Sequence, residues 1–174
     1  MNTLSKMDAI TMLKADHRKV EALFEQFTAA VSATTKKSIA HQICMELTVH
    51  TRIEEDIFYP ACEGAVDEAM LKEAYVEHDA AKVLMAEIEA GEPADAFYDA
   101  KVKVLSEEIA HHVKEEEGRA DGMFAQARKA GLDIDGLGAK MAAEKIRLMQ
   151  SYKSGGLPTP DTRTMTVTSL QKVH

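Results

Sequence analysis

Apolar residues recur at steps of three and four along most of the chain, which is the spacing of the buried face of an amphipathic helix. The first such stretch begins near Ser5 and continues to a turn at Ser32–Thr35. Thr34 or Thr35 is expected to cap the second helix. Pro60 should end that helix, because the residue before a proline is driven out of helical geometry.

The second half of the chain repeats this arrangement. A third helix is predicted over about residues 65–90, where a Gly-Glu-Pro sequence stops it. A fourth is predicted over residues 95–131, with Asp95 as its cap and a weak segment at Gly118 and Gly122. A shorter fifth helix should cover residues 135–151.

Four long helices joined by short turns predict an all-α fold, specifically an antiparallel up-down-up-down four-helix bundle. We expect the bundle to occupy residues 1–131, an accessory C-terminal helix residues 132–153, and an extended or mobile tail residues 154–174. The ten methionines and the low aromatic content of 5% agree with helices and disfavour a sandwich or barrel.

Charge and cysteine content narrow the function classes. The 21 Lys and Arg residues against 29 Asp and Glu residues give a net charge of -8, which disfavours nucleic acid and anionic membranes as partners. The absence of a membrane-spanning stretch and of a signal-peptide pattern predicts a cytoplasmic protein. Cys44 and Cys62 are too few for a disulfide framework or a zinc cage, and we expect both to be buried or boundary thiols.

Histidines occur on the apolar faces, one on each of the four long helices: His17, His50, His78 and His112. A single histidine on an apolar face is usually a hydrogen-bonded core residue. Burying four imidazoles would cost free energy four times unless the histidines share a binding partner. The separation between the two histidines is nearly equal in each half of the chain, which indicates two equivalent helical hairpins.

A glutamate follows the histidine by four residues in the second and the fourth helix, as Glu54 after His50 and Glu116 after His112. Four residues make about one helical turn, so both side chains of each pair project from the same face. Each hairpin therefore supplies one histidine and then an H-x-x-x-E motif. This repetition predicts a centre that holds two metal ions.

The donor set favours particular metals. Four imidazole nitrogens and two carboxylates that bridge through both oxygens give about eight donor atoms, which leaves about two positions free on two six-coordinate ions joined by an oxo or hydroxo bridge. Nitrogen and oxygen donors in this ratio suit iron, or else manganese, better than calcium or magnesium. Zinc fits less well because it prefers four ligands.

The pattern resembles the hemerythrin-like (HHE cation-binding) domain, whose motif is H, H-x-x-x-E, H, H-x-x-x-E on a four-helix bundle. The resemblance covers roughly residues 8–125 and is carried by Asp16-His17, His50–Pro60, Glu77-His78 and His111–Glu116. It implies a non-heme di-iron centre with two Fe ions. The implied terminal ligands are His17, His50, His78 and His112, and the implied bridges are Glu54 and Glu116.

Two departures from the oxygen-carrying members of this family bear on function. Those proteins have a further histidine four residues after the third-helix histidine, and an aspartate as the second bridge. Lys82 and Glu117 stand at the corresponding places here. The chain is therefore more similar to the bacterial hemerythrin-like proteins, whose proposed roles include oxygen, nitric oxide or peroxide chemistry and iron or redox sensing.

Three hypotheses remain open at this point. The first is a di-iron protein that acts on or senses O2, peroxide or nitric oxide. The second is an iron- or redox-sensing or iron-binding module without turnover, which reaches a protein partner or another copy of itself through the C-terminal helix and tail. The third is a metal-free helical interaction protein. A ferritin-like di-iron protein is rejected, because only Glu108 to His111 matches its E-x-x-H motif.

Several side chains near the motif have alternative roles. His111 and Glu115 form a competing H-x-x-x-E, but their face of the helix is mostly polar and we expect His111 at the surface. Glu21 and Glu46 would either hydrogen-bond an imidazole or remain solvated. Tyr59 and Tyr75 are expected to line the pocket or to pack against other side chains. His41 and His174 are expected to lie outside the site.

Overall fold

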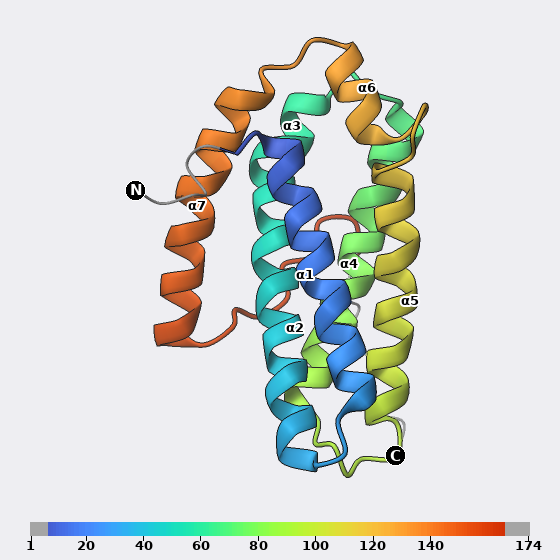
Figure 1. Ribbon diagram of the computed structural model, residues 1–174, viewed down its shortest axis with the longest axis vertical. Helices are drawn as coiled ribbons and strands as arrows, with labels where there is room; N and C mark the ends of the chain where they lie inside the picture. The colour runs from blue at the N-terminus through green and yellow to red at the C-terminus, as the bar shows by residue number, and fades with distance from the viewer. Residues whose placement is uncertain (1–6, 166–174) are drawn as a thin grey trace.

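The computed structural model describes residues 7–165, and this part of the chain consists of helices and their connections (Figure 1). The all-α fold is therefore confirmed. No helix among these residues combines the length and the hydropathy that crossing a bilayer requires. The elements are α1 (Ala9–Ala29), α2 (Ala33–Ile53), the π-helical turn η2 (Glu54–Phe58), α3 (Tyr59–Cys62), α4 (Glu68–Ala90), α5 (Tyr98–Glu116), α6 (Met123–Lys129) and α7 (Ile134–Gly155).

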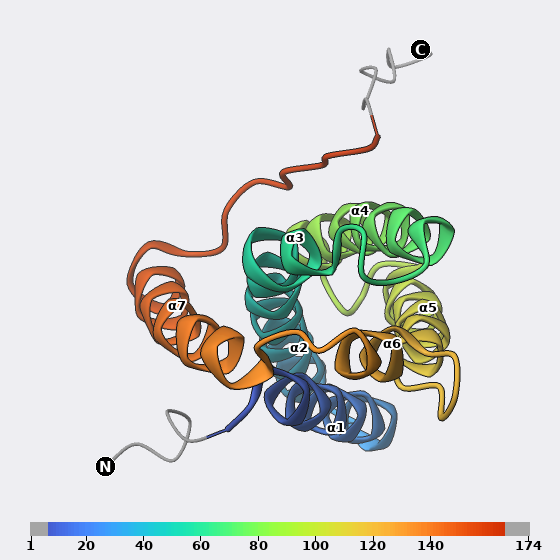
Figure 2. The same cartoon turned by 90° about the horizontal axis from the view of Figure 1, so that it is seen from above.

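The helices α1, α2, α4 and α5 form the bundle, and each runs opposite to the helix before it (Figure 1). Seen from above, α6 lies over one end of the bundle and α7 packs outside it, beside α1 and α2 (Figure 2). The apolar core has two parts. The first, towards α6 and α7, includes Leu13, Ile53, Phe58, Phe124 and Met141. The second, towards the opposite end, includes Val20, Phe24, Leu47, Leu105 and Ile109.

The helix starts differ from those expected. Asp8 caps α1 by accepting from the Thr11 N–H at 2.9 Å, so the described helix does not reach back towards Ser5. Ser32 caps α2 by accepting from Thr35 N–H, and the expectation of Thr34 or Thr35 as the cap was wrong. Both caps have extended backbone geometry and satisfy one N–H of the first turn, as a cap must.

Pro60 does not end the second helix, contrary to expectation. The chain passes from α2 into η2, where Tyr59 N–H bonds to Glu54 O, and continues helically to Cys62. Pro60 lies in the first turn of α3, where its missing N–H matters least. The wide turn also makes two consecutive acids point inward, since Glu54 and Glu55 are both buried.

The later helix boundaries also differ. The third helix begins at Glu68 after its cap Asp67, and the fourth at Tyr98, after a turn in which Asp95 accepts from the Glu92 N–H. The fourth helix ends at Glu116, and α6 is a separate helix. A Cβ at Gly122 would lie 2.4 Å from Gly118 N, so these glycines allow a tight loop that interrupts the helix.

The C-terminal part begins with α7, which starts after its cap Asp133 and ends at Gly155 rather than at Ser151. The chain then runs back across α2 and α4 as an extended segment, here called the C-terminal strap, residues 157–165 (Figure 2). The strap is held by hydrogen bonds to Asp79, which accepts from the backbone N–H groups of Arg163 and Thr164. His174 lies outside the described residues.

The docking of α7 on the start of α1 depends on Gly138. A Cβ at this position would lie 2.5 Å from Met7 O and 2.7 Å from Ala9 N. We expect Gly138→Ala to lower the free energy of unfolding by about 1–3 kcal/mol, because overpacking outweighs the better helix propensity of alanine. Gly155→Ala in the same helix is the control, since a Cβ there meets nothing within 4 Å. Equal effects of the two substitutions in urea unfolding would contradict this account.

Candidate metal centre

The six side chains predicted as ligands meet in a polar layer between the two apolar clusters, and all six are buried. The Nε2 atoms of His17 and His50 are 3.2 Å apart, and those of His78 and His112 are also 3.2 Å apart. Each hairpin therefore brings its two imidazoles together with their Nε2 atoms facing the centre. The geometry has the convergence that a metal site needs, from residues spread over one hundred positions of sequence.

The donors form two groups that share a carboxylate. One group contains His17, His50, Glu54 and Glu116, and the other contains Glu54, His78 and His112, with the ligand atoms of each group within 4.8 Å of one another. Glu54 Oε2 lies 3.1 Å from His50 Nε2 and 3.3 Å from His78 Nε2. The Glu116 oxygens likewise face His17 and His112, at 3.3 and 3.6 Å.

Every imidazole of the centre has a second carboxylate beside its outer nitrogen, Nδ1, and for His17, His78 and His112 this carboxylate lies within hydrogen-bond distance. Each of these outer carboxylates comes from a neighbouring helix and directly adjoins a predicted ligand in the chain. The Nδ1 distances are 3.7 Å from His50 to Asp16, 3.1 Å from His78 to Glu55, 2.7 Å from His112 to Glu77 and 2.7 Å from His17 to Glu117. A ring of four acids therefore surrounds the four histidines.

This ring fixes the chemical state of the imidazoles. A carboxylate that accepts from Nδ1–H leaves the Nε2 lone pair directed at the centre, which is the tautomer that binds a metal. Burial and the nearby imidazole of His112 hold the pKa of His78 well below its usual value. Burial also lowers the pKa of His50, although Asp16 opposes the effect. Both shifts favour the neutral imidazole that a metal ion requires. At His112, burial is outweighed by Glu116 and Glu77, which raise the pKa.

The side chains of the centre leave the Glu54 carboxylate uncompensated. Within residues 7–165, neither carboxylate oxygen of Glu54 has a hydrogen-bond partner. Its Oε2 faces the lone pairs of two imidazoles, and burial together with the charge of Glu116 raises the pKa of Glu54 well above normal. Burial alone would raise the pKa of Glu116 too. The charge of His112 and the hydrogen bond with His17 outweigh burial and lower that pKa to about 2. A cation among these atoms would relieve the conflict, so the donor set fits a metal ion.

The outer acids were not predicted from the sequence. Glu21 and Glu46, for which a hydrogen bond to an imidazole was the alternative to a charge at the margin of the apolar face, do not reach the imidazoles. Glu21 pairs with Arg18 at 3.2 Å within α1, and Glu46 of α2 pairs with Lys19 at 2.6 Å. A signal for the true partners was present in the sequence, because an acid adjoins a ligand at the same place in both hairpins.

Tyr59 reaches the centre, although packing was its expected role. Its hydroxyl donates to Glu116 Oε1 at 3.0 Å and lies 3.2 Å from His78 Nε2 and 3.4 Å from His112 Nε2. Burial and the charge of Glu116 raise the pKa of Tyr59 well above normal. Tyr75 packs edge-on against the Tyr59 ring, with centroids 5.2 Å apart, and supports it.

The other candidates lie where the polar pattern placed them. His111 is exposed, 3.3 Å from Glu115, and His41 is an exposed partner of Glu89. Lys82, which stands where oxygen carriers have a histidine, forms ion pairs with Glu55 and Asp79 instead of entering the centre. Cys44 and Cys62 are buried free thiols, and burial raises the pKa of both.

A void of about 10 Å³ lies against the four imidazoles. Its remaining wall includes Val20, Leu47, Ile109 and Val113, which are apolar. The void is comparable to the space that one water molecule occupies. A molecule of two or three heavy atoms would need only small movements of these side chains, whereas an organic substrate has no room.

Comparison with known proteins bears on this site. The family model for the hemerythrin HHE cation binding domain matches residues 8–123. A "DNA nickase" from Nostoc sp. (strain PCC 7120 / SAG 25.82 / UTEX 2576) is 28% identical over 122 residues, which are 70% of this chain but 34% of that protein. The chain thus spans about a third of the length of that relative.

A solved structure is also similar. The chain superposes with a TM-score of 0.73 on a hemerythrin HHE cation binding domain-containing protein, the Rv2633c homolog from Mycobacterium kansasii. The sequences are 21% identical, and the match covers 87% of this chain and 95% of the other. This similarity supports the fold. The family match and the histidine–glutamate clusters together indicate metal binding.

The conflict of charges at Glu54 predicts a measurable effect. We expect Glu54→Gln to stabilise the metal-free protein, by about 1–3 kcal/mol, because the amide replaces a buried carboxylate that lacks a partner. Glu68→Gln, at an exposed ion pair with Lys72, is the control and should change little. Urea unfolding of chelator-treated protein measures both. A large loss of stability in Glu54→Gln would show that the carboxylate is satisfied without a cation.

Proposed function

Because the chain belongs to the hemerythrin HHE cation-binding domain family, we propose that its buried histidines and glutamates hold two non-heme iron ions joined by an oxo or hydroxo bridge. His17 and His50 would serve one ion, and His78 and His112 the other. Glu54 and Glu116 would bridge them. The observation that supports two ions rather than one is the pair of donor groups that share Glu54.

The chemistry of the donors supports iron. Imidazole nitrogens and carboxylate oxygens in this ratio suit a redox-active first-row metal, whereas calcium and magnesium prefer oxygen ligands alone. The outer acids support the same conclusion, because a carboxylate on Nδ1 makes an imidazole a stronger donor and fixes its orientation. Each of the four histidines has such an acid within 3.7 Å.

We further propose that Tyr59 supplies a seventh donor. Its hydroxyl lies among ligand atoms of the second group, which has one carboxylate fewer than the first. The phenol proton has an acceptor in Glu116 Oε1, 3.0 Å away. Tyr59 would thus be a seventh ligand residue, on the side of the centre that has fewer donors.

The proposed ligand or substrate is O2, hydrogen peroxide or nitric oxide, because the small void admits only a molecule of a few heavy atoms. Iron in such a site supplies reversible one-electron chemistry and an open position for O2, peroxide or nitric oxide. The chain provides the enclosure: apolar side chains of α1, α2 and α5 line the void and keep bulk water from the centre. Disproportionation of two peroxide molecules into two waters and O2 needs no organic cofactor and no further substrate.

Sensing without turnover is the second candidate. It is favoured by the contact of the outer acid Glu55 with the C-terminal strap through Arg163, which links His78 to a surface segment that a protein partner or another copy could bind. DNA cleavage is not proposed. The match covers 34% of the nickase, and a net charge of -8 opposes the approach of DNA.

His112 and its neighbour His111 give a matched pair of variants that tests metal binding. Protein made in iron-rich medium should contain two irons per chain and should evolve oxygen from peroxide. His112→Ala should reduce the iron content to one or none and abolish oxygen evolution. His111→Ala should change neither, because His111 is a surface residue. Two irons per chain without oxygen evolution would favour the sensing role, and iron-free protein would contradict the proposal.

The role of Tyr59 has a spectroscopic test. A phenolate bound to ferric iron gives a visible charge-transfer absorption band, which we expect in the oxidised iron-loaded protein. Tyr59→Phe should remove this band while the iron content stays at half or more of the wild-type value. Tyr75→Phe, a neighbour that does not reach the donors, should keep the band. A band unchanged in Tyr59→Phe would exclude the tyrosine as a ligand.

A further inference from the structure

The C-terminal segment contributes charges to the centre from outside the region that the family model matches. That match ends at residue 123, whereas α7 and the C-terminal strap follow it. Lys145 of α7 is buried and pairs with Asp16. Arg163 of the strap places its Nε 2.7 Å from Glu55 Oε2. Asp16 and Glu55 are two of the four outer acids.

The two contacts have the same form. Asp16 receives Lys145 on Oδ1 and turns Oδ2 towards His50 Nδ1, 3.7 Å away. Glu55 receives Arg163 on Oε2 and turns Oε1 towards His78 Nδ1, 3.1 Å away. In each case one carboxylate oxygen binds a C-terminal cation and the other faces an imidazole of the centre, and Glu55 is also paired with Lys82 of α4, at 2.7 Å from Oε1. One histidine of each donor group is thereby connected to the C-terminal segment.

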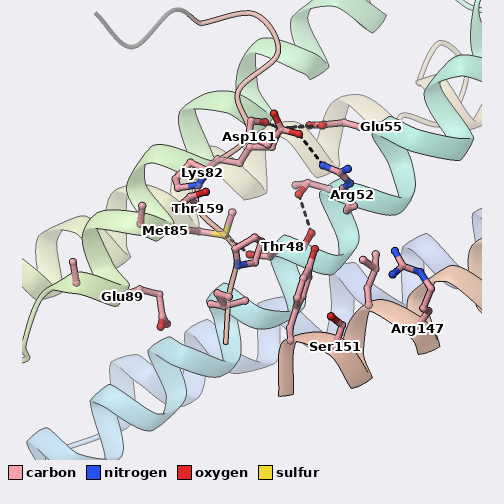
Figure 3. A pocket seen from close by; sticks show the side chains of 18 residues that line it. Thr48, Arg52, Glu55, Lys82, Met85, Glu89, Arg147, Ser151, Thr159 and Asp161 are labelled. Atoms are coloured by element: carbon pink, nitrogen blue, oxygen red, sulfur yellow. Dashed lines mark hydrogen bonds and ion pairs between the residues drawn. The ribbon is translucent and has the colours of Figure 1, made fainter. Parts of the chain in front are cut away.

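The strap is built to hold this position. Asp79, which is fully buried, accepts hydrogen bonds from the backbone N–H groups of Arg163, Thr164 and Met165. Lys82 joins the strap to α4, because it pairs with Glu55 and also donates to Asp161 O at 2.9 Å. Figure 3 shows Lys82, Glu55 and Asp161 close together at one wall of a cavity of about 690 Å³ beneath the strap.

The other two outer acids are different. Glu117 and Glu77 are each 21% exposed at the side chain, whereas Glu55 is 1% exposed and Asp16 is 10% exposed. The cations nearest to Glu117 come from α1, with Arg18 at 2.7 Å. The C-terminal segment thus acts on His50 and His78, and it leaves His17 and His112 to acids that solvent can reach.

We propose that Lys145 and Arg163 are positioning residues of the metal centre. They orient Asp16 and Glu55 against His50 and His78, and they limit the negative charge that these acids pass to the imidazoles. The C-terminal segment then positions ligands of the centre in addition to packing against the bundle. The effect of Lys145 and Arg163 on a bound metal rests on the proposed function. Their effect on the orientation of the imidazoles does not depend on a metal.

The metal-free protein gives the first test. Solvent exchange of each histidine Nδ1–H, followed by NMR, reports how firmly the outer acid holds that ring. Arg163→Gln should accelerate exchange at His78 by about tenfold, because a hydrogen bond to a charged group weakened by about 1.4 kcal/mol corresponds to that factor. Lys145→Gln should accelerate exchange at His50 by less, because Asp16 Oδ2 lies 3.7 Å from that Nδ1. His17 and His112 should be unaffected. Equal acceleration at all four rings, or none, would overturn the proposal.

The second test uses the iron-loaded protein and separates positioning from plain stabilisation. Without the arginine, more negative charge reaches His78 and favours the ferric state. Arg163→Gln should therefore lower the reduction potential, by about 59 mV if the ferric-to-ferrous ratio changes tenfold. Arg163→Lys should restore most of the wild-type potential. Arg147→Gln, at an exposed pair with Glu144 in α7, is the control and should leave the potential unchanged.

The outcomes distinguish this inference from the proposed function. Failure of the protein to take up iron would contradict the proposed function, and the exchange rates would still decide whether Lys145 and Arg163 position the imidazoles. An unchanged potential in Arg163→Gln with two irons bound would overturn the inference and leave the di-iron centre standing. If Lys145→Gln does not fold, Lys145→Arg and the strap variants carry the test.

Discussion

The carboxylates of Glu54 and Glu116 face four imidazole lone pairs in a layer that apolar clusters close on both sides. Water cannot compensate these groups, and the hydrogen bonds within the layer leave both Glu54 oxygens without a partner. Such an arrangement is costly for a protein that only needs a stable bundle. A bound cation would coordinate these oxygen and nitrogen atoms and remove the repulsion between them. The bundle places the donors as such a cation would require.

Two further layers of charged side chains surround the ligand side chains. The inner donors are held by the outer acids, and two of these acids are held in turn by Lys145 and Arg163. The outer acids adjoin the ligands in the sequence, whereas the two cations come from α7 and the strap. The centre is therefore stabilised by contacts across most of the described chain, which explains why a four-helix bundle of this size also uses a fifth long helix.

The convergence of the six inner side chains was predictable because it depends on helical periodicity. His17, His50, His78 and His112 lie on apolar faces, and an acid four residues after a histidine shares its face in any helix. The position of Tyr59 depends on the π-helical turn, which shifts the register of the chain after Ile53 in a way that no local pattern announces. The contacts of Arg163 depend on the path of an irregular segment and have no periodicity at all.

Anomalous diffraction at the iron edge, from crystals of the iron-loaded protein, tests most directly whether two metal ions lie between the paired hairpins. Two peaks about 3.5–4 Å apart are predicted, one beside His17 and His50 and the other beside His78 and His112. A single peak in the layer, or iron only at the exposed group of Glu73, Glu77, His111 and Glu115, would contradict the proposed di-iron centre.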